Sequence, residues 1–289
     1  MKNAQQMVIP TADLGGFEPY NAAHAIVGCT ITVQFPGHIN GPDWITIKSA
    51  ALSAARELGL GVPQPFYGLN VSFDGARAGV SLNAPTPAVS QIGGLTFGRL
   101  DEDDQLLERI IVARDGIIIS NNSYVRWGSF FERAQVFLKA VFPAYRAIGP
   151  CGGYKLEYWD RFDKAEGVKE HNAFGVIAPQ SEYVSRRAID EVDPWHSYSG
   201  HFIRVNDQVR RLVNVRVDCG DYQWRDGNMR RSILIYSMNH DALGAPGYLD
   251  LPEGFSIEAL YSGLQDQHVR LKTILEEIIS PEAKQRIGL

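Results

Sequence analysis

The sequence lacks the residues and runs that define several large classes of protein. Its three cysteines are far apart and odd in number, and no Cys-x-x-Cys pair occurs among the 289 residues. This argues against a disulfide framework or a zinc knuckle and favours a reducing compartment. No apolar run approaches the roughly 20 residues of a membrane-spanning helix, and no basic segment followed by an apolar core opens the chain. We therefore expect a cytoplasmic protein without a membrane segment.

Motifs of common catalytic and nucleotide-binding sites are also missing. The Gly-Gly pairs at 93–94 and 152–153 lack the spacing of Gly-x-Gly-x-x-Gly, and no Walker-type phosphate loop occurs. No Gly-x-Ser-x-Gly, His-Glu-x-x-His or protein-kinase motif is present either. The acidic run at 101–104 lacks the ligand spacing of a calcium-binding loop. These absences favour a protein without catalytic activity, and they point to no cofactor.

Charge is moderate and slightly acidic. The net charge is -5 and the isoelectric point is near 5.8, which argues against a protein that coats nucleic acid. A local basic patch is compatible with this balance. Hydrophobic residues make up 45% of the chain, which is enough for a substantial buried core.

The first part of the chain combines strand and helix patterns. Residues 24–35 alternate apolar and polar side chains, as a strand with one buried face does. Asp115-Gly116 lies between two apolar runs, which predicts a β-hairpin. Residues 129–142 carry an apolar stripe at helical spacing. The serine that begins this segment and the glutamate three residues later have the spacing of a capping box. We expect Pro143 to end this helix.

The last part of the chain has the same outline. Strands are expected at 202–205, 212–217 and 231–238, and the longest helix follows at 257–279. His268 lies on the apolar seam of that helix, where a hydrogen-bonded core histidine is the usual role. Strands interrupted by single helices favour an α+β fold of mostly antiparallel sheets with long helices packed on one face. We expect two similar-looking halves.

The boundary between these halves is expected where periodicity fades. Residues 163–199 hold charges, glycine, proline and isolated aromatics without a regular pattern. The predicted organisation is an N-terminal α+β half at 1–162, an irregular connection at 163–199 and a C-terminal α+β half at 200–289 that ends in the long helix.

Arginine and aromatic residues gather at one predicted turn of the second half. The segment 222–231 holds Tyr222, Trp224, Arg225, Arg230 and Arg231. Arginine beside exposed aromatics grips single-stranded nucleic acid or phosphorylated ligands in many proteins. The same side chains serve equally as a solvated turn or as anchors for a protein partner, since Tyr, Trp and Arg dominate interface hot spots. These five residues are candidate binding residues, either for nucleic acid or a phosphorylated ligand or for a protein partner.

A second group of side chains has metal-ligand chemistry. Asp193, His196 and His201 lie close together in the irregular connection and just after it. Two histidines and a carboxylate can hold a transition metal. Closeness in sequence does not make the three converge, so surface or packing histidines are the alternative.

Three segments carry a resemblance to a known family. Tyr124-Val125-Arg126-Trp127 follows the predicted hairpin and leads into a helix, residues 154–162 form the next strand, and a long helix from 257 closes the chain. Together these segments resemble a sporadically distributed family of uncharacterised bacterial proteins of about this length. The chain departs from the family at 154–162, where the family has an "RYINRI"-like run, and at Tyr261, where it has histidine.

The resemblance implies a bacterial or mobile-element origin and brings no catalytic residues. Patchy distribution is typical of defence, toxin–antitoxin and phage-related genes. Tyr124 and Trp127, the two residues that define the shared segment, are expected to set the angle at which the following helix lies on its sheet.

The sequence thus leaves three functions open. The first is a non-catalytic interaction or regulatory protein of a bacterial defence, toxin–antitoxin or phage-related system, with a protein partner. The second is a sensor that binds a nucleotide or single-stranded nucleic acid through 222–231. The third is a metal-dependent hydrolase built on Asp193, His196 and His201.

Overall fold

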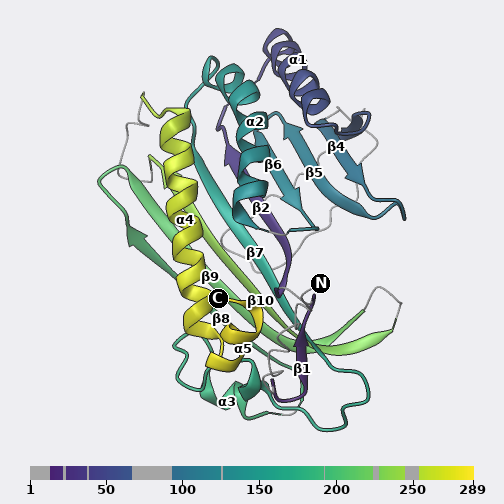
Figure 1. Cartoon of the computed structure of the whole chain (residues 1–289). Coiled ribbons are helices and arrows are strands. Elements are labelled where there is room, and N and C mark those ends of the chain that lie inside the picture. The colour runs from purple at the N-terminus through teal and green to yellow at the C-terminus, as the bar shows by residue number, and fades with distance from the viewer. Residues whose placement is uncertain are drawn as a thin grey trace, which may run out of the picture.

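The fold is built on one large antiparallel sheet (Figure 1). The computed structural model describes residues 14–21, 24–37, 39–66, 93–124, 126–191, 193–223, 228–244 and 254–289. Within this part of the chain, ten strands pair in the order β3-β4-β5-β6-β2-β7-β10-β9-β8, and β1 pairs with β7 outside this path. The strands are β1 (Phe17–Pro19), β2 (Ile26–Gln34), β3 (Gln64–Phe66), β4 (Gly94–Leu100), β5 (Leu106–Ala113), β6 (Gly116–Asn121), β7 (Gly153–Lys164), β8 (Trp195–Arg204), β9 (Val209–Gln223) and β10 (Met229–Leu243).

Three long helices cover one face of this sheet (Figure 1). They are α1 (Gly41–Glu57), α2 (Trp127–Arg146) and α4 (Ile257–Ile278). The predicted α+β class, with long helices on antiparallel strands, is confirmed. None of the described helices is both long and apolar enough to cross a bilayer. The short helices are α3 (Arg186–Ile189), α5 (Pro281–Ile287) and the 3-10 helix η1 (Ala173–Gly175).

Local sequence signals account for most of these elements. The strand predicted at 24–35 is β2, and the Asp115-Gly116 turn joins β5 to β6 as predicted. The long helix α4 begins after Ser256, whose hydroxyl accepts from the backbone N–H of Ala259. Such a cap satisfies one of the N–H groups that a helix start leaves without a partner.

Helix α2 differs from its prediction at both ends. Its N-cap is Arg126, and the Ser129 hydroxyl donates back to the Arg126 carbonyl, so the predicted capping box is wrong. Pro143 lies inside the helix, which continues to Arg146. Proline normally disrupts a helix interior because it lacks an N–H. Here the turn beyond it is held by Tyr145, whose ring stacks on Phe35 at 4.5 Å between centroids.

The sheet joins the two predicted halves instead of separating them. Strand β7, from the first half, pairs with β2 on one side and with β10, from the second half, on the other. The prediction of two similar-looking halves is therefore not confirmed. Strand β7 runs to Lys164 and β8 begins at Trp195, so strand structure enters both ends of the segment 163–199 that was predicted to be irregular.

Candidate functional site

The residues predicted as metal ligands are not brought together. His196 pairs with Asp218 and His201 pairs with Val213 along strand β8. Two residues five positions apart in a strand project from opposite faces of the sheet, because side chains alternate. Asp193 precedes the strand and is exposed. Across the described residues, no group of three or more His, Cys, Asp or Glu side chains could hold a metal ion, so the geometry gives the metal prediction no support.

The residues predicted as a binding hairpin lie where β9 turns into β10. Tyr222 is directly opposite Arg230, and Asp221 is opposite Arg231. The Arg231 guanidinium donates to the Asp221 carboxylate at 2.8 Å, which offsets one positive charge of the hairpin. Trp224 and Arg225 lie outside the described residues. Nucleotide or nucleic-acid binding by this hairpin stays a prediction.

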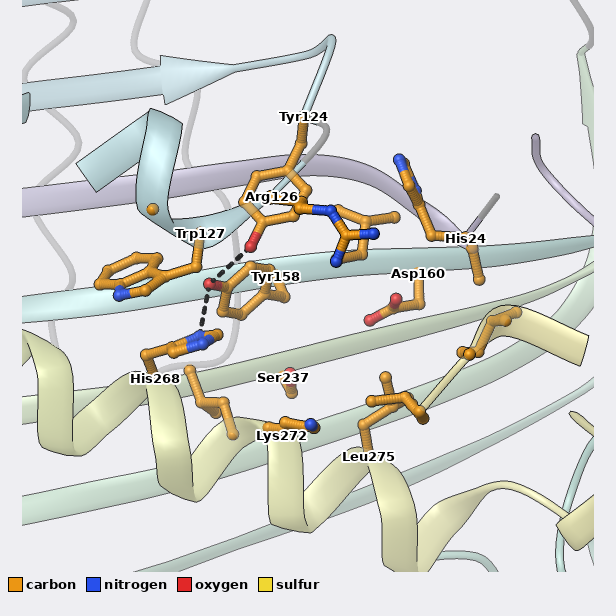
Figure 2. Close-up of a pocket in the computed structure, with 17 residues that line it drawn as sticks. His24, Tyr124, Arg126, Trp127, Tyr158, Asp160, Ser237, His268, Lys272 and Leu275 are labelled. Atoms are coloured by element: carbon orange, nitrogen blue, oxygen red, sulfur yellow. Dashed lines mark hydrogen bonds between the residues drawn. The ribbon is translucent and has the colours of Figure 1, made fainter. Parts of the chain in front are cut away.

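A cavity of ≈ 370 Å³ opens between α4, the start of α2 and the middle of the sheet (Figure 2). Its volume lies within the usual range of small-molecule sites. Strands β2, β7 and β10, the β6–α2 junction, helix α4 and the end of α5 all contribute to its wall. The wall is apolar along Ala25, Ile26, Leu271, Leu275 and Ile287, and polar or ionisable at His24, Tyr124, Arg126, Tyr158, Asp160, Ser237, His268 and Lys272.

Asp160 is the most unusual residue of this wall. Its side chain is on the helix-facing side of β7, and only 1% of the residue is exposed. Figure 2 shows the carboxylate pointing into the space between β7 and α4. Oxygen Oδ1 has no hydrogen-bond partner among the described residues, and burial raises the pKa of this carboxyl to about 7. A buried carboxylate without a partner is rare because desolvation is unfavourable.

The register of the sheet helps to explain why Oδ1 of Asp160 has no partner among the described residues. Its neighbours on the adjacent strands are Ile26 of β2 and Ile235 of β10, and neither side chain has a donor. The pairing of β2 with β7 also shifts between Ile26 and Gly28, which marks a β-bulge. Bulges are common beside functional sites because they re-aim side chains.

Two tyrosines and a histidine form a polar chain beside Asp160. The Tyr158 hydroxyl lies 2.9 Å from Nδ1 of His268 and 3.5 Å from the Tyr124 hydroxyl (Figure 2). Burial, helped by the Lys272 ammonium, lowers the pKa of His268 to about 4, so the imidazole is neutral at pH 7. Burial also raises the pKa values of both tyrosines. The chain therefore offers neutral donors and acceptors to the cavity.

An aromatic stack fixes the helix boundary of the cavity. The Trp127 ring lies between Phe131 at 4.7 Å and His268 at 4.5 Å, both nearly parallel to it. Its Nε1 donates to Oε1 of Gln265 at 2.6 Å. Trp127 therefore positions the start of α2, and it does so against α4. His268 is hydrogen-bonded, as predicted, but it is half-buried at the cavity wall and does not lie in the core.

The start of α2 makes one side of the cavity electropositive. Arg126 is exposed at its N-cap, no side chain caps the helix, and its first turn holds no acidic residue. The first backbone N–H groups of a helix have no internal acceptor and carry a partial positive charge. Lys272 adds a second exposed cation from α4, 3.9 Å from Glu276.

This arrangement is suited to binding and less to covalent chemistry. Burial raises the pKa of the Cys29 thiol, which disfavours the reactive thiolate. The cavity instead combines an apolar wall with a few convergent polar groups, which is the pattern of sites for small organic ligands.

Sequence reasoning named none of the deep polar groups of this cavity as a site. Tyr124 and Trp127 were assigned to packing alone, and Asp160 was not singled out. One signal was readable: Tyr154, Leu156 and Tyr158 share one face of the predicted strand, and the next residue on that face is Asp160. A carboxylate on an otherwise apolar face is informative, because it needs either a partner or a ligand.

The chain matches no protein-family model and no curated protein sequence. The resemblance to a bacterial family therefore stays a prediction.

Proposed function

We propose that the protein binds a small organic molecule in the cavity between α4 and the sheet and that this binding serves a regulatory, non-catalytic role. The observation that carries the proposal is the buried Asp160 carboxylate, which points into the cavity and whose Oδ1 has no hydrogen-bond partner in the part of the chain that the structure describes. An unpaired buried carboxylate destabilises the fold. A ligand that donates hydrogen bonds to it offsets that penalty, so the penalty favours the bound state.

A paired-variant experiment tests this proposal. Gly128 lines the cavity, and a Cβ atom added there meets no atom within 4 Å. Gly128→Phe therefore adds a ring at the α2 wall of the cavity without a backbone clash. Gly41, in the first turn of α1, has equally open surroundings and lies outside the cavity wall. Gly41→Phe is thus a matched control.

The measurement is thermal unfolding with a panel of nucleotides, amino acids, polyamines and aromatic acids. A ligand at 100 times its Kd stabilises the folded state by about 2.7 kcal/mol, which raises Tm by several degrees. We expect at least one compound to raise Tm in the wild type and in Gly41→Phe, with a smaller shift in Gly128→Phe. The proposal fails if no compound shifts the wild type or if Gly128→Phe responds fully.

A second candidate function is regulation through a protein partner, in the bacterial defence, toxin–antitoxin or phage-related context that the resemblance implies. It is supported by an exposed patch on β8, which lies at one edge of the sheet. Tyr198 and Phe202 are 66% and 58% exposed, and the Arg210 guanidinium lies 4.3 Å from the Phe202 ring centroid. Aromatic and arginine side chains are enriched at interface hot spots.

Co-expression with the products of adjacent genes tests this second function. A Tyr198→Ser, Phe202→Ser double variant should lose the co-purified partner. The control is Val269→Ser on α4, which removes another exposed apolar side chain, 57% exposed, far from this patch in sequence and on another element. Retention of the partner by the double variant would place the interface elsewhere.

A further inference from the structure

The two sides of the cavity have opposite chemistry. Its depth holds the Asp160 carboxylate, whose Oδ1 has no hydrogen-bond partner among the described residues and whose directly opposite neighbours, Ile26 and Ile235, carry no donor. Its rim holds the exposed side chains of Arg126 and Lys272 and the uncapped start of α2. No ion pair joins Asp160 to either cation among the residues described. Figure 2 shows Asp160 below Arg126 and across from Lys272.

The deep side requires a donor. A carboxylate with free lone pairs binds best to a group that presents two parallel N–H donors, such as an amidinium, a guanidinium or the donor edge of guanine. The surrounding side chains of Tyr124, Tyr158 and His268 are neutral at pH 7. They leave Asp160 as the one acidic group in the depth of the cavity among the described residues. Its pKa of about 7 makes it half ionised at pH 7, and a bound cationic donor favours the ionised form.

The rim requires an anion. A helix N-terminus with free N–H groups binds phosphate or carboxylate, and nearby cations strengthen this preference. Arg126 lies at the N-cap of α2 and Lys272 lines the same cavity from α4. The unpartnered Asp160 in the same cavity shows that this helix start belongs to a polar site and is not only a solvated end.

We propose that the ligand is bipolar: an N–H donor head binds Asp160, and a carboxylate or phosphate on the same molecule binds Arg126, Lys272 and the start of α2. This inference rests on the proposed small-molecule function. It narrows the ligand to a class that neither simple amines nor simple acids belong to.

Two matched probe series test the ligand class by isothermal titration calorimetry. The carboxylate series is 4-amidinobenzoate, benzamidine and benzoate, where the first compound has both groups and the others have one each. The phosphate series is GMP, guanosine and ribose 5-phosphate, built in the same way. We expect the bipolar probe of at least one series to bind at least tenfold more tightly than either of its halves.

Two variants assign each half of the ligand to its side of the cavity. Asp160→Asn should weaken the bipolar probe at least tenfold and leave the affinity for the acid-only probe unchanged. Arg126→Gln should weaken the bipolar probe and leave the donor-only probe unchanged. Arg109→Gln, an exposed arginine on β5 away from the cavity wall, is the control and should change neither affinity.

The outcomes separate this inference from the proposed function. Failure of both bipolar probes to bind, or binding no tighter than that of their halves, overturns the bipolar ligand. If panel compounds of another class still raise Tm in the wild type but less in Gly128→Phe, the cavity remains a ligand site. If no compound acts there, both proposals fall together.

Discussion

Two carboxylates face α4 from neighbouring strands, and their surroundings are opposite. Asp241 on β10 accepts from the Arg211 guanidinium at 2.5 and 2.8 Å, and Arg211 also donates to Asp266 of α4 at 2.7 Å. Asp160 on β7 has an oxygen without any partner among the described residues. Both residues are at most 1% exposed. Helix α4 thus covers one carboxylate that is neutralised by an arginine and one that has no ion pair with a described residue.

Strand register accounts for the difference. Arg211 is directly opposite Asp241 in the β9–β10 pairing, so the chain places a cation beside that carboxylate. The residues opposite Asp160 are Ile26 and Ile235. A buried ion pair fixes how two elements meet, whereas an unpaired buried charge makes the fold less stable. The buried ion pairs of Arg211 thus stabilise the fold, and the unpaired Oδ1 of Asp160 supports the proposal that this residue binds a ligand.

The largest expected loss of stability comes from breaking the ion pair between Asp241 and Arg211. Asp241→Asn leaves the Arg211 guanidinium buried without its main countercharge, and removal of one partner of a buried pair destabilises a protein by about 3–5 kcal/mol. Chemical denaturation should show this loss. The control is Asp266→Asn, because Asp266 is 63% exposed and such a pair contributes about 0.2–1 kcal/mol. Equal losses in the two variants would contradict a buried, structural role for the pair.

A substitution of Asp160 should change how the stability of the fold depends on pH. The pKa of Asp160 is raised by burial to about 7, whereas an unfolded aspartate titrates near 3.9. The folded state therefore keeps a proton that the unfolded state releases, and stability falls as pH rises from about 4 to about 7. Asp160→Asn should remove a slope on the order of 1.4 kcal/mol per pH unit.

Denaturation of both proteins between pH 4 and 8 measures this slope. His24 and His268, whose pKa values burial lowers, also titrate, and Arg126 and Lys272 face the same cavity. All four are present in both proteins, so the difference between the two curves isolates Asp160. Parallel curves would show that the carboxyl is solvated or paired, and the contrast with Asp241 would disappear.

The smallest expected loss of stability comes from removing the Tyr158 hydroxyl. Tyr158→Phe removes the hydroxyl that joins His268 to Tyr124, and loss of one such hydrogen bond costs about 1 kcal/mol. Tyr236→Phe, which removes the hydroxyl that donates to Glu157 at 2.7 Å, is a comparable loss outside the cavity wall. If Tyr158→Phe lost about as much stability as Asp241→Asn, the chain of Tyr124, Tyr158 and His268 would have a structural role like that of the Asp241–Arg211 pair.

Much of the fold follows from local patterns, and the site does not. Alternation in β2 and the Asp115-Gly116 turn are readable because each depends on a few adjacent residues. The end of α2 was not, because the packing of Tyr145 on Phe35 overrides the local effect of Pro143. Tertiary contacts of this kind leave no local signal.

The cavity depends on strand order, which the sequence does not state. Asp160, Ser237 and His268 meet because β7 pairs with β10 and α4 crosses both. Alternation along the strand allows Asp160 to be placed on the face of Tyr158, yet that its opposite neighbours are Ile26 and Ile235, which have no donor, depends on the strand pairing. For the same reason His196 and His201 looked like a pair in sequence and separate once β8 is a strand.

The position of β7 has a consequence for how the protein is made. Strand β7 pairs with β1 and β2, which precede it in the chain, and with β10, which follows it. The edge that pairs with β10 is therefore uncovered until the residues from Met229 onward are made. During translation the ribosome releases β7 well before β10, and an uncovered strand edge recruits other strands. Non-local pairing is also slow to form. We therefore expect this edge of β7 to stay open until β10 emerges, and the cavity, whose wall includes α4 and the end of α5, to form only after that.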